Sequence, residues 1–149
     1  MTTETLIQVR GLEKLFAGNH IKALNGVSAD IHRGEVVVVI GPSGSGKSTF
    51  LRCLNLLEIP SAGTITFEGT DITDPKVDID QMRRQMGMVF QHFNLFPNMT
   101  IRKNITLAPV RTKLMSQEQA DEEATALLRR VGLEEKADAY PNQLSGGQK

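Results

Sequence analysis

A glycine-rich segment at residues 41–48 has the residue types and the spacing of a phosphate-binding loop. It reads Gly41, Pro42, Ser43, Gly44, Ser45, Gly46, Lys47, Ser48 and fits G-x-x-x-x-G-K-[ST] at every fixed position. Glycines let a backbone curl so that successive N–H groups point at phosphate oxygens, and a following helix adds its positive N-terminal end. The competing interpretation is a glycine-rich turn that binds nothing. The pattern alone does not separate kinases, GTPases and transport ATPases, which all use such a loop.

Three side chains of this segment are expected to act on a nucleoside triphosphate. Lys47 should reach the β- and γ-phosphates as a mobile point charge. Ser48 should complete the shell of a Mg²⁺ ion whose other ligands are mostly water and phosphate oxygens. Thr49 can add a hydrogen bond to the α-phosphate. The expected cofactors are therefore ATP and Mg²⁺.

The loop must be held between a strand and a helix, and the sequence predicts both. Residues 36–40 are five consecutive β-branched residues, which is typical of a strand covered on both faces in a parallel α/β sheet. Residues 48–57 predict the helix.

Weaker patterns predict the remaining elements. Apolar residues in the opening stretch 6–12 predict an edge strand, and alternation over 27–31 predicts a half-buried strand. Residues 64–67 and 88–90 predict short strands, and residues 78–86 predict a helix. Ser116 with Gln119 predicts a capping-box helix start, and Gly132 predicts where that helix ends.

Composition narrows the possible functions. The 149 residues contain 17 Lys plus Arg and 17 Asp plus Glu, and this balance argues weakly against nucleic-acid binding. The single cysteine, Cys53, is expected to be a small buried residue in a reducing compartment. The polar start of the chain does not resemble a signal peptide. The longest apolar run, 36–40, is far shorter than the about 20 residues of a membrane span, so a partner is expected to provide any connection to a membrane.

Two further motifs narrow the class. Residues 144–148, Leu-Ser-Gly-Gly-Gln, resemble the LSGGQ signature of the ABC ATPase family at all five positions, and Gln91 resembles the glutamine of that family's Q-loop. Phosphate loop, Q-loop and signature follow in the family's order. Taken alone, the signature segment is equally consistent with a flexible Ser-Gly loop before a helix.

The resemblance implies a fold and a site. It implies an α/β P-loop NTPase core with an antiparallel β subdomain and a helical subdomain, divided as 1–92 and 93–149, with the C-terminal part of the core missing. Gln91 would meet Mg²⁺ or the attacking water, and Phe16 would stack on adenine, although Phe16 is also consistent with a core residue. Two ATPase subunits, expected to be identical, would face each other head to tail. Each ATP would then meet the signature of the other subunit, whose contact residues are Ser145, Gly146, Gly147 and Gln148.

The amino-acid sequence at residues 87–100, 52–55 and 104–109 resembles that of the family branch that takes up polar amino acids. That resemblance implies a peripheral location on the cytoplasmic face of the membrane. It also implies an integral-membrane permease as direct partner, a substrate-binding protein as indirect partner, and no nucleic acid. Four apolar residues are expected either to receive a permease helix or to form a small core: Phe93, Leu95, Phe96 and Met99.

The sequence also departs from the family. The Walker B aspartate, the catalytic glutamate and the switch histidine would follow the signature, and the chain stops at Lys149. We therefore expect a fragment that does not hydrolyse ATP by itself. The alternative is a naturally short nucleotide-binding module that does not hydrolyse ATP. A soluble ABC ATPase of translation or DNA repair would normally show a second cassette or a long coiled coil, and the sequence has neither.

Overall fold

The structure is a computed structural model that describes residues 4–16, 18 and 20–149. The chain forms two compact units, Met1–Gly87 and Met88–Lys149.

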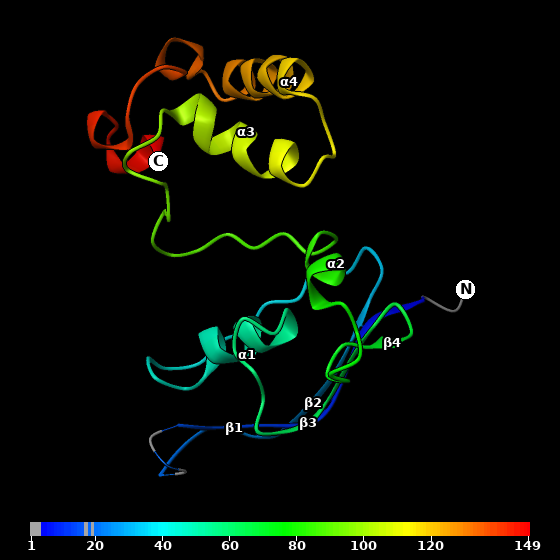
Figure 1. Cartoon of the computed structure of the whole chain (residues 1–149). Helices are drawn as coiled ribbons and strands as arrows, with labels where there is room; N and C mark the ends of the chain where they lie inside the picture. The colour runs from blue at the N-terminus through cyan, green and yellow to red at the C-terminus, as the bar shows by residue number, and fades with distance from the viewer. Residues whose placement is uncertain (1–3, 17, 19) are drawn as a thin grey trace. The chain divides into compact units, whose positions relative to one another are not determined.

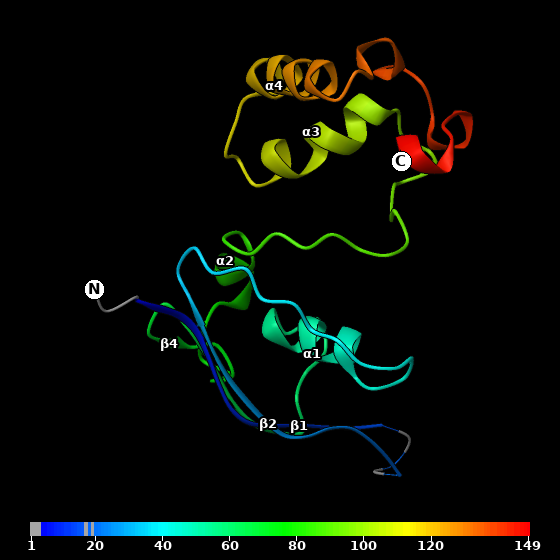
Figure 2. The same ribbon diagram turned by 180° about the vertical axis from the view of Figure 1, so that it is seen from behind.

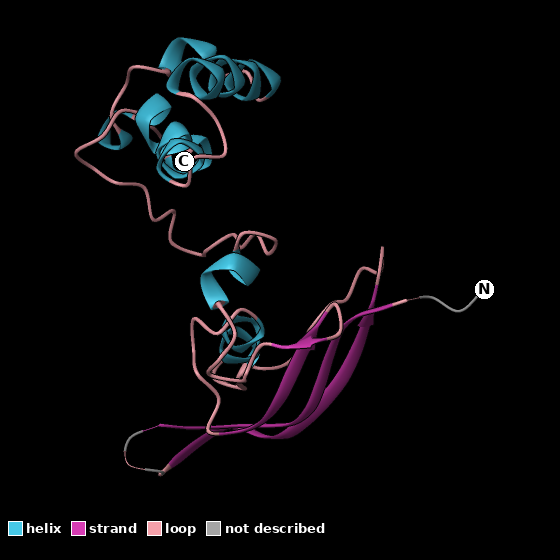
Figure 3. Cartoon of the chain, turned by 45° about the vertical axis from the view of Figure 1, so that its right-hand side comes forward, coloured by secondary structure: helices cyan, strands magenta, loops and turns pink. Residues whose placement is uncertain are grey.

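The first unit is built on a four-stranded antiparallel sheet (Figure 1). Its strands are β1 (Thr5–Phe16), β2 (Ile21–His32), β3 (Ala62–Phe67) and β4 (Thr70–Asp71), and they lie in the order β2-β1-β3-β4. Figure 3 shows the long strands curving together as one layer. The antiparallel β subdomain expected from the sequence is therefore present.

Two helices cover one face of this sheet, as the opposite views of Figures 1 and 2 agree. They are α1 (Lys47–Leu54) and α2 (Ile79–Arg83). Side chains from the sheet, from α1 and from the turn after β4 form the buried core between these layers: Val9, Leu12, Leu24, Phe50, Cys53, Ile65, Phe67 and Ile72. Cys53 is fully buried, as predicted, and burial raises the pKa of its thiol.

The prediction that the opening stretch forms an edge strand is wrong, because β1 pairs with β2 on one side and with β3 on the other. A shift in register between Val9 and Leu12 explains the unusual spacing of its apolar residues. Gly11 lies inside this irregularity with φ +56°. The extra residue allows both Val9 and Leu12 to face the core although they are three apart.

The buried strand predicted at residues 36–40 is not formed. These residues run extended without pairing, and Val36, Val38 and Ile40 are 88%, 77% and 87% exposed. A β-branched run becomes a buried strand only when neighbouring strands and helices cover it. Among the residues that the structure describes, no strand pairs with this segment. The apolar run is therefore left open.

Other predicted boundaries shift as well. The first helix ends at Leu54 and not at residue 57, since Leu56 adopts a left-handed conformation with φ +53° that no helix continues through. The helix predicted at 78–86 forms only over Ile79–Arg83, capped by Asp78. The short strand predicted at 88–90 is absent, and Val89 is almost fully exposed.

The second unit is helical. Its main elements are α3 (Ile101–Arg111) and α4 (Gln117–Arg130), which pack side by side (Figures 1 and 2). Three short 3-10 helices follow at Glu134–Lys136, Pro141–Gln143 and Gly146–Gln148. A small core unites them: Ile101, Leu128, Ala137 and Leu144 are buried together. The expected helical subdomain is therefore present.

The start of α4 confirms the predicted capping box. The Gln119 N–H donates to Ser116 Oγ at 3.2 Å, and the Ser116 N–H donates to Gln119 Oε1 at 3.0 Å. The helix ends just before Gly132, which takes φ +72° as a helix-terminating glycine does. Across the described part of the chain, no helix combines the length and the apolar character that crossing a bilayer requires.

Candidate functional site

The glycine-rich segment forms a loop that enters α1 directly (Figure 1). Around it lies a pocket of about 230 Å³. Its lining comes from the loop, from the first turn of α1 and from one residue of β2: Ser43, Gly44, Ser45, Gly46, Lys47, Ser48, Thr49 and Ala23. The structure therefore brings most of the predicted phosphate-binding residues together. It also adds Ala23, which no motif in the sequence indicated.

At two glycines of the loop an added Cβ would press on a neighbouring atom. A Cβ at Gly46 would lie 2.3 Å from the Ala23 carbonyl oxygen, and Gly46 has φ +89°. A Cβ at Gly41 would lie 2.7 Å from Ser45 Oγ. Neither position accommodates a larger residue without movement of the backbone or of the loop's own hydroxyl. The close approach of the loop to β2 thus depends on Gly46, whereas the Ser45 hydroxyl can rotate away from a Cβ at Gly41.

The start of α1 differs from the starts of α2, α3 and α4. Side chains of Asp78, Thr100 and Ser116 cap α2, α3 and α4 by accepting hydrogen bonds from backbone N–H groups. The N-cap of α1 is Gly46, with no side-chain cap and no acidic residue in the first turn. The first N–H groups of a helix have no partner within the helix, and the helix dipole makes this end positive. Such an end suits a phosphate group.

Lys47 places its ammonium inside the curl of the loop. Its Nζ donates to the carbonyl oxygens of Gly41 at 2.8 Å and Pro42 at 2.7 Å, and lies 3.4 Å from Ser45 Oγ. These contacts hold a positive charge at the loop, and Lys47 is one of the residues that line the pocket. When a phosphate binds, Lys47 would exchange its neutral carbonyl partners for charged phosphate oxygens. These oxygens form stronger hydrogen bonds with an ammonium.

Two hydroxyls stand in the first turn of α1. Ser48 is exposed and Thr49 is half-buried, and both line the pocket. An exposed hydroxyl next to a phosphate cradle is a suitable ligand for Mg²⁺, which prefers oxygen donors and retains several waters. The residues present therefore fit ATP with Mg²⁺.

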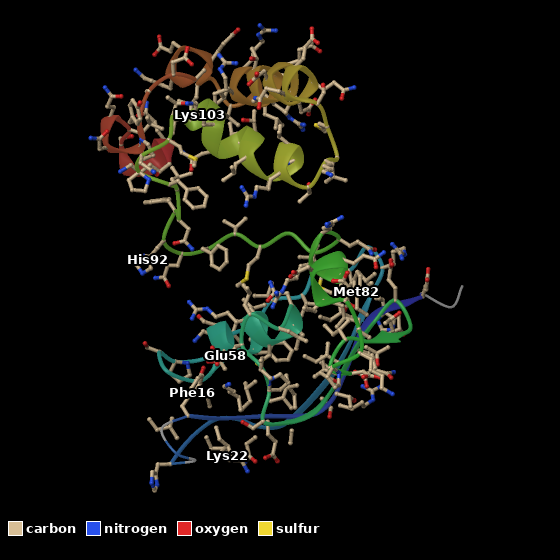
Figure 4. All side chains as sticks on the ribbon, in the orientation of Figure 1. Phe16, Lys22, Glu58, Met82, His92 and Lys103 are labelled. Atoms are coloured by element: carbon tan, nitrogen blue, oxygen red, sulfur yellow. The ribbon has the colours of Figure 1, made fainter. Side chains whose placement is uncertain are left out.

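Phe16 lies half-buried at the end of β1 and is labelled in Figure 4. It pairs with Ile21 across the hairpin, two residues from Ala23 of the pocket lining. Phe16 is therefore at the same end of the sheet as the phosphate loop. The ammonium of Lys14 stands over its ring, 4.9 Å from the centroid.

The remaining predicted site residues belong to the second unit. Gln91 is exposed in the segment before α3. In the signature, Leu144 is buried in the helical core while Ser145, Gly146 and Gly147 are exposed. The Ser145 N–H donates to Gln148 Oε1 at 3.0 Å, which folds the segment into a short turn of helix. A Cβ at Gly146 or Gly147 would meet no atom within 4 Å, so packing within this unit does not require these glycines.

A glycine-rich loop of this spacing that leads into an uncapped helix is typical of phosphate-loop nucleotide-binding proteins. The model of the ABC transporter family matches residues 24–149 of this chain. The chain therefore belongs to the ABC transporter family, as its motifs predicted.

Named relatives agree with this assignment. The chain is 58% identical over 144 residues to the arginine transport ATP-binding protein ArtM of Bacillus subtilis, covering 97% of this chain and 59% of that protein. It is 52% identical over 143 residues to the glutamine transport ATP-binding protein GlnQ of the same organism, covering 96% and 58%. The chain thus spans somewhat more than half the length of these relatives.

Solved structures show the same fold. The ATP-binding cassette MJ0796, in a dimeric post-hydrolysis state bound to ADP and phosphate, superposes with a TM-score of 0.85 at 36% identity. That match covers 96% of this chain and 65% of the cassette. The expected P-loop NTPase fold class is confirmed.

Proposed function

We propose that the protein, at the length of its relatives, is the ATP-binding subunit of an importer that takes up polar amino acids. The uncapped helix start behind the glycine loop carries the nucleotide-binding part of this proposal, since it offers backbone donors and a positive end to phosphate. The names of the relatives, which transport arginine and glutamine, support the amino acid part. These relatives do not favour the alternative of a short module without transport function.

Each loop residue has a role in holding ATP. Backbone N–H groups of residues 41–48, except Pro42, which has none, surround the β- and γ-phosphates. Lys47 neutralises the charge of these phosphates, and Thr49 hydrogen-bonds the α-phosphate. Ser48 would supply an oxygen ligand to Mg²⁺, and Gln91 would either be a second ligand or orient the attacking water. When bound, Mg²⁺ neutralises the charge that develops on the phosphate oxygens. Phe16 stacks on adenine.

We assign the second half of each site to a second, identical subunit. Ser145, Gly146, Gly147 and Gln148 of one subunit meet the γ-phosphate held by the other. The exposure of the first three and the open space around both glycines support this assignment. A related cassette is a dimer in its solved structure. Within each subunit we keep the division expected from the sequence, in which residues 1–92 hold the nucleotide and residues 93–149 present the signature.

The membrane partner is an integral-membrane permease, which places the subunit peripherally on the cytoplasmic face of the membrane. A substrate-binding protein delivers the amino acid to that permease. Of the four apolar residues considered for docking, Phe93 and Phe96 are exposed, whereas Leu95 packs against the helical core and Met99 is half-buried. We therefore assign permease docking to the two phenylalanines and a structural role to Leu95.

A lysine substitution tests the site. Lys47→Ala removes the cation held inside the loop, and a charge-assisted contact of this kind contributes about 1.5–3 kcal/mol. We expect ATP binding by the full-length protein to weaken by a factor of roughly 10 to 150 and steady-state hydrolysis to be lost. Isothermal titration calorimetry and phosphate release measure the two effects. The exposed Lys76 provides the matched control, and Lys76→Ala should leave both unchanged. Unchanged hydrolysis in Lys47→Ala would exclude the assigned site.

The transport part needs a separate assay. The full-length subunit is reconstituted with its permease and binding protein in vesicles, and uptake of labelled arginine, glutamine, glutamate and histidine is compared. We expect ATP-dependent uptake of at least one of them. Uptake that is absent for all four, with hydrolysis intact, would reject the amino acid assignment but leave the nucleotide site in place.

A further inference from the structure

Lys14 is the least exposed of the lysines in ion pairs on the sheet, and its ammonium has three partners. Its Nζ lies 2.8 Å from Glu58 Oε1 and donates to the Ile59 carbonyl oxygen at 2.6 Å. It also stands over the ring of Phe16, 4.9 Å from the centroid. The Lys14 side chain is only 13% exposed. An ammonium held this closely restricts the positions of the Phe16 ring and the Glu58 carboxylate that it contacts.

These partners come from two separate parts of the first unit. Lys14 and Phe16 are two residues apart on β1, and the ring contact shows that both side chains lie on the same side of the strand. Glu58 and Ile59 follow the end of α1, the helix that begins at the phosphate loop. Figure 4 labels Phe16 and Glu58. Lys14 thus connects the ring of Phe16 to the segment that leaves the phosphate-loop helix.

A second lysine nearby shows what an ordinary surface pair looks like in this sheet. Lys22 of β2 lies 3.7 Å from Glu13 Oε2, and its side chain is 46% exposed. Such solvated pairs contribute little. Lys22 is labelled in Figure 4 and offers a matched control at the same end of the hairpin.

We propose that Lys14 is a positioning residue for the nucleotide base, which fixes the ring of Phe16 so that the face opposite the ammonium stacks on adenine. This inference rests on the proposed function and on the assigned contact of Phe16 with the base. A cation within about 6 Å of a ring centroid attracts the ring face. A ring that is already fixed before ATP arrives loses less conformational freedom on binding. Lys14 therefore acts on ATP affinity through Phe16 and not through the phosphates.

The test compares two ligands that differ in the base. Dissociation constants of ATP and of inorganic tripolyphosphate, each with Mg²⁺, are measured by calorimetry on the full-length protein. Lys14→Met keeps the apolar stem and removes the charge. It should raise the dissociation constant of ATP by roughly two- to tenfold and leave that of tripolyphosphate unchanged. Lys14→Arg, which retains a cation able to stack on the ring, should restore most of the ATP affinity.

A double-mutant cycle shows whether Lys14 acts through the ring. Phe16→Ala should itself weaken ATP and not tripolyphosphate, and adding Lys14→Met to it should cause no further loss. Lys22→Met should change the dissociation constant of neither ATP nor tripolyphosphate. If Lys14→Met folds poorly because it leaves Glu58 unpaired, Lys14→Met combined with Glu58→Gln removes that charge and is compared in the same way.

The outcomes separate this inference from the proposed function. Equal losses for both ligands, no loss for ATP, or an undiminished loss in the Phe16→Ala background would each overturn the role of Lys14. If Phe16→Ala leaves ATP binding unchanged, the base contact and this inference both fail, while tripolyphosphate binding still supports the phosphate loop. If the wild-type protein binds neither ligand, the proposed nucleotide site itself fails.

Discussion

Single residues of the phosphate loop are limited by what surrounds them. Gly44 and Gly46 both have positive φ, at +80° and +89°. A Cβ at Gly44 would meet nothing within 4 Å, whereas a Cβ at Gly46 would press on the Ala23 carbonyl oxygen. The two positions therefore separate the strain of a left-handed backbone from the cost of a direct clash.

We expect Gly46→Ala to destabilise the first unit more than Gly44→Ala. Gly44→Ala should lower the free energy of unfolding by about 1–2 kcal/mol, from left-handed strain alone. Gly46→Ala adds to this strain the clash with the Ala23 carbonyl oxygen of β2. Urea unfolding followed by a probe on the sheet measures both midpoints. Equal midpoints for the two variants would show that the loop can move away from β2 without penalty.

At the scale of elements, contacts between residues close in the chain stabilise the ends of the helices. The clearest is the C-terminal end of α4, where Arg129 grips Glu134 with two hydrogen bonds, Nε to Oε2 at 3.0 Å and Nη2 to Oε1 at 2.6 Å. This pair closes the turn from α4 into the following 3-10 helix. The hydrogen bonds from Arg129, with its positive charge, lower the pKa of the Glu134 carboxyl.

The Arg129 pair adds an acid-sensitive contribution to stability, which is small because both side chains are exposed to solvent. Because the folded pKa of Glu134 lies below its unfolded value, the stabilisation is present above the unfolded pKa and is lost as pH falls through the folded pKa. Titration of carboxyl carbons by NMR should show Glu134 titrating below about 4.3, the ordinary glutamate pKa. Arg129→Gln should raise that pKa, and Arg130→Gln, which removes the adjacent cation, should not. A Glu134 pKa that is the same in both variants would contradict the pairing.

At the scale of the whole molecule, the length of the chain determines whether residues 36–40 are exposed or covered. Their side chains are open in this chain, with Val36 and Val38 at 88% and 77% exposure. Exposed apolar segments with unpaired strand edges favour aggregation. The relatives are longer than this chain, and in a full-length protein we expect further strands to cover the segment.

Charges placed on this segment should therefore act in opposite directions in two contexts. Val36→Lys with Val38→Lys should make residues 1–149 more soluble, because it interrupts the apolar run. The same pair should destabilise the full-length protein, since a buried unpaired charge is costly. Light scattering and thermal unfolding measure the two effects, with Lys76→Ala as the neutral control. Improved solubility in both contexts would mean that the segment stays at the surface.

The residues that the sequence predicted best are those whose partners are close in the chain. The glycine loop, the capping box at Ser116 and the helix stop at Gly132 each depend on hydrogen bonds and backbone angles within a few residues. The signature was recognisable by its resemblance to a family motif of five contiguous residues. Local geometry of this kind is written in consecutive residue types, so one sequence is enough to find it.

Tertiary structure alone decided which segments became neighbours. The sequence did not reveal that β1 lies between β2 and β3, that no strand among the described residues pairs with residues 36–40, or that Ala23 lines the pocket. It also gave no sign that Lys14 bridges Phe16 and Glu58, which are far apart in the chain. Strand pairing and cation–ring contacts join residues whose separation leaves no periodic pattern, so only the folded chain brings them together.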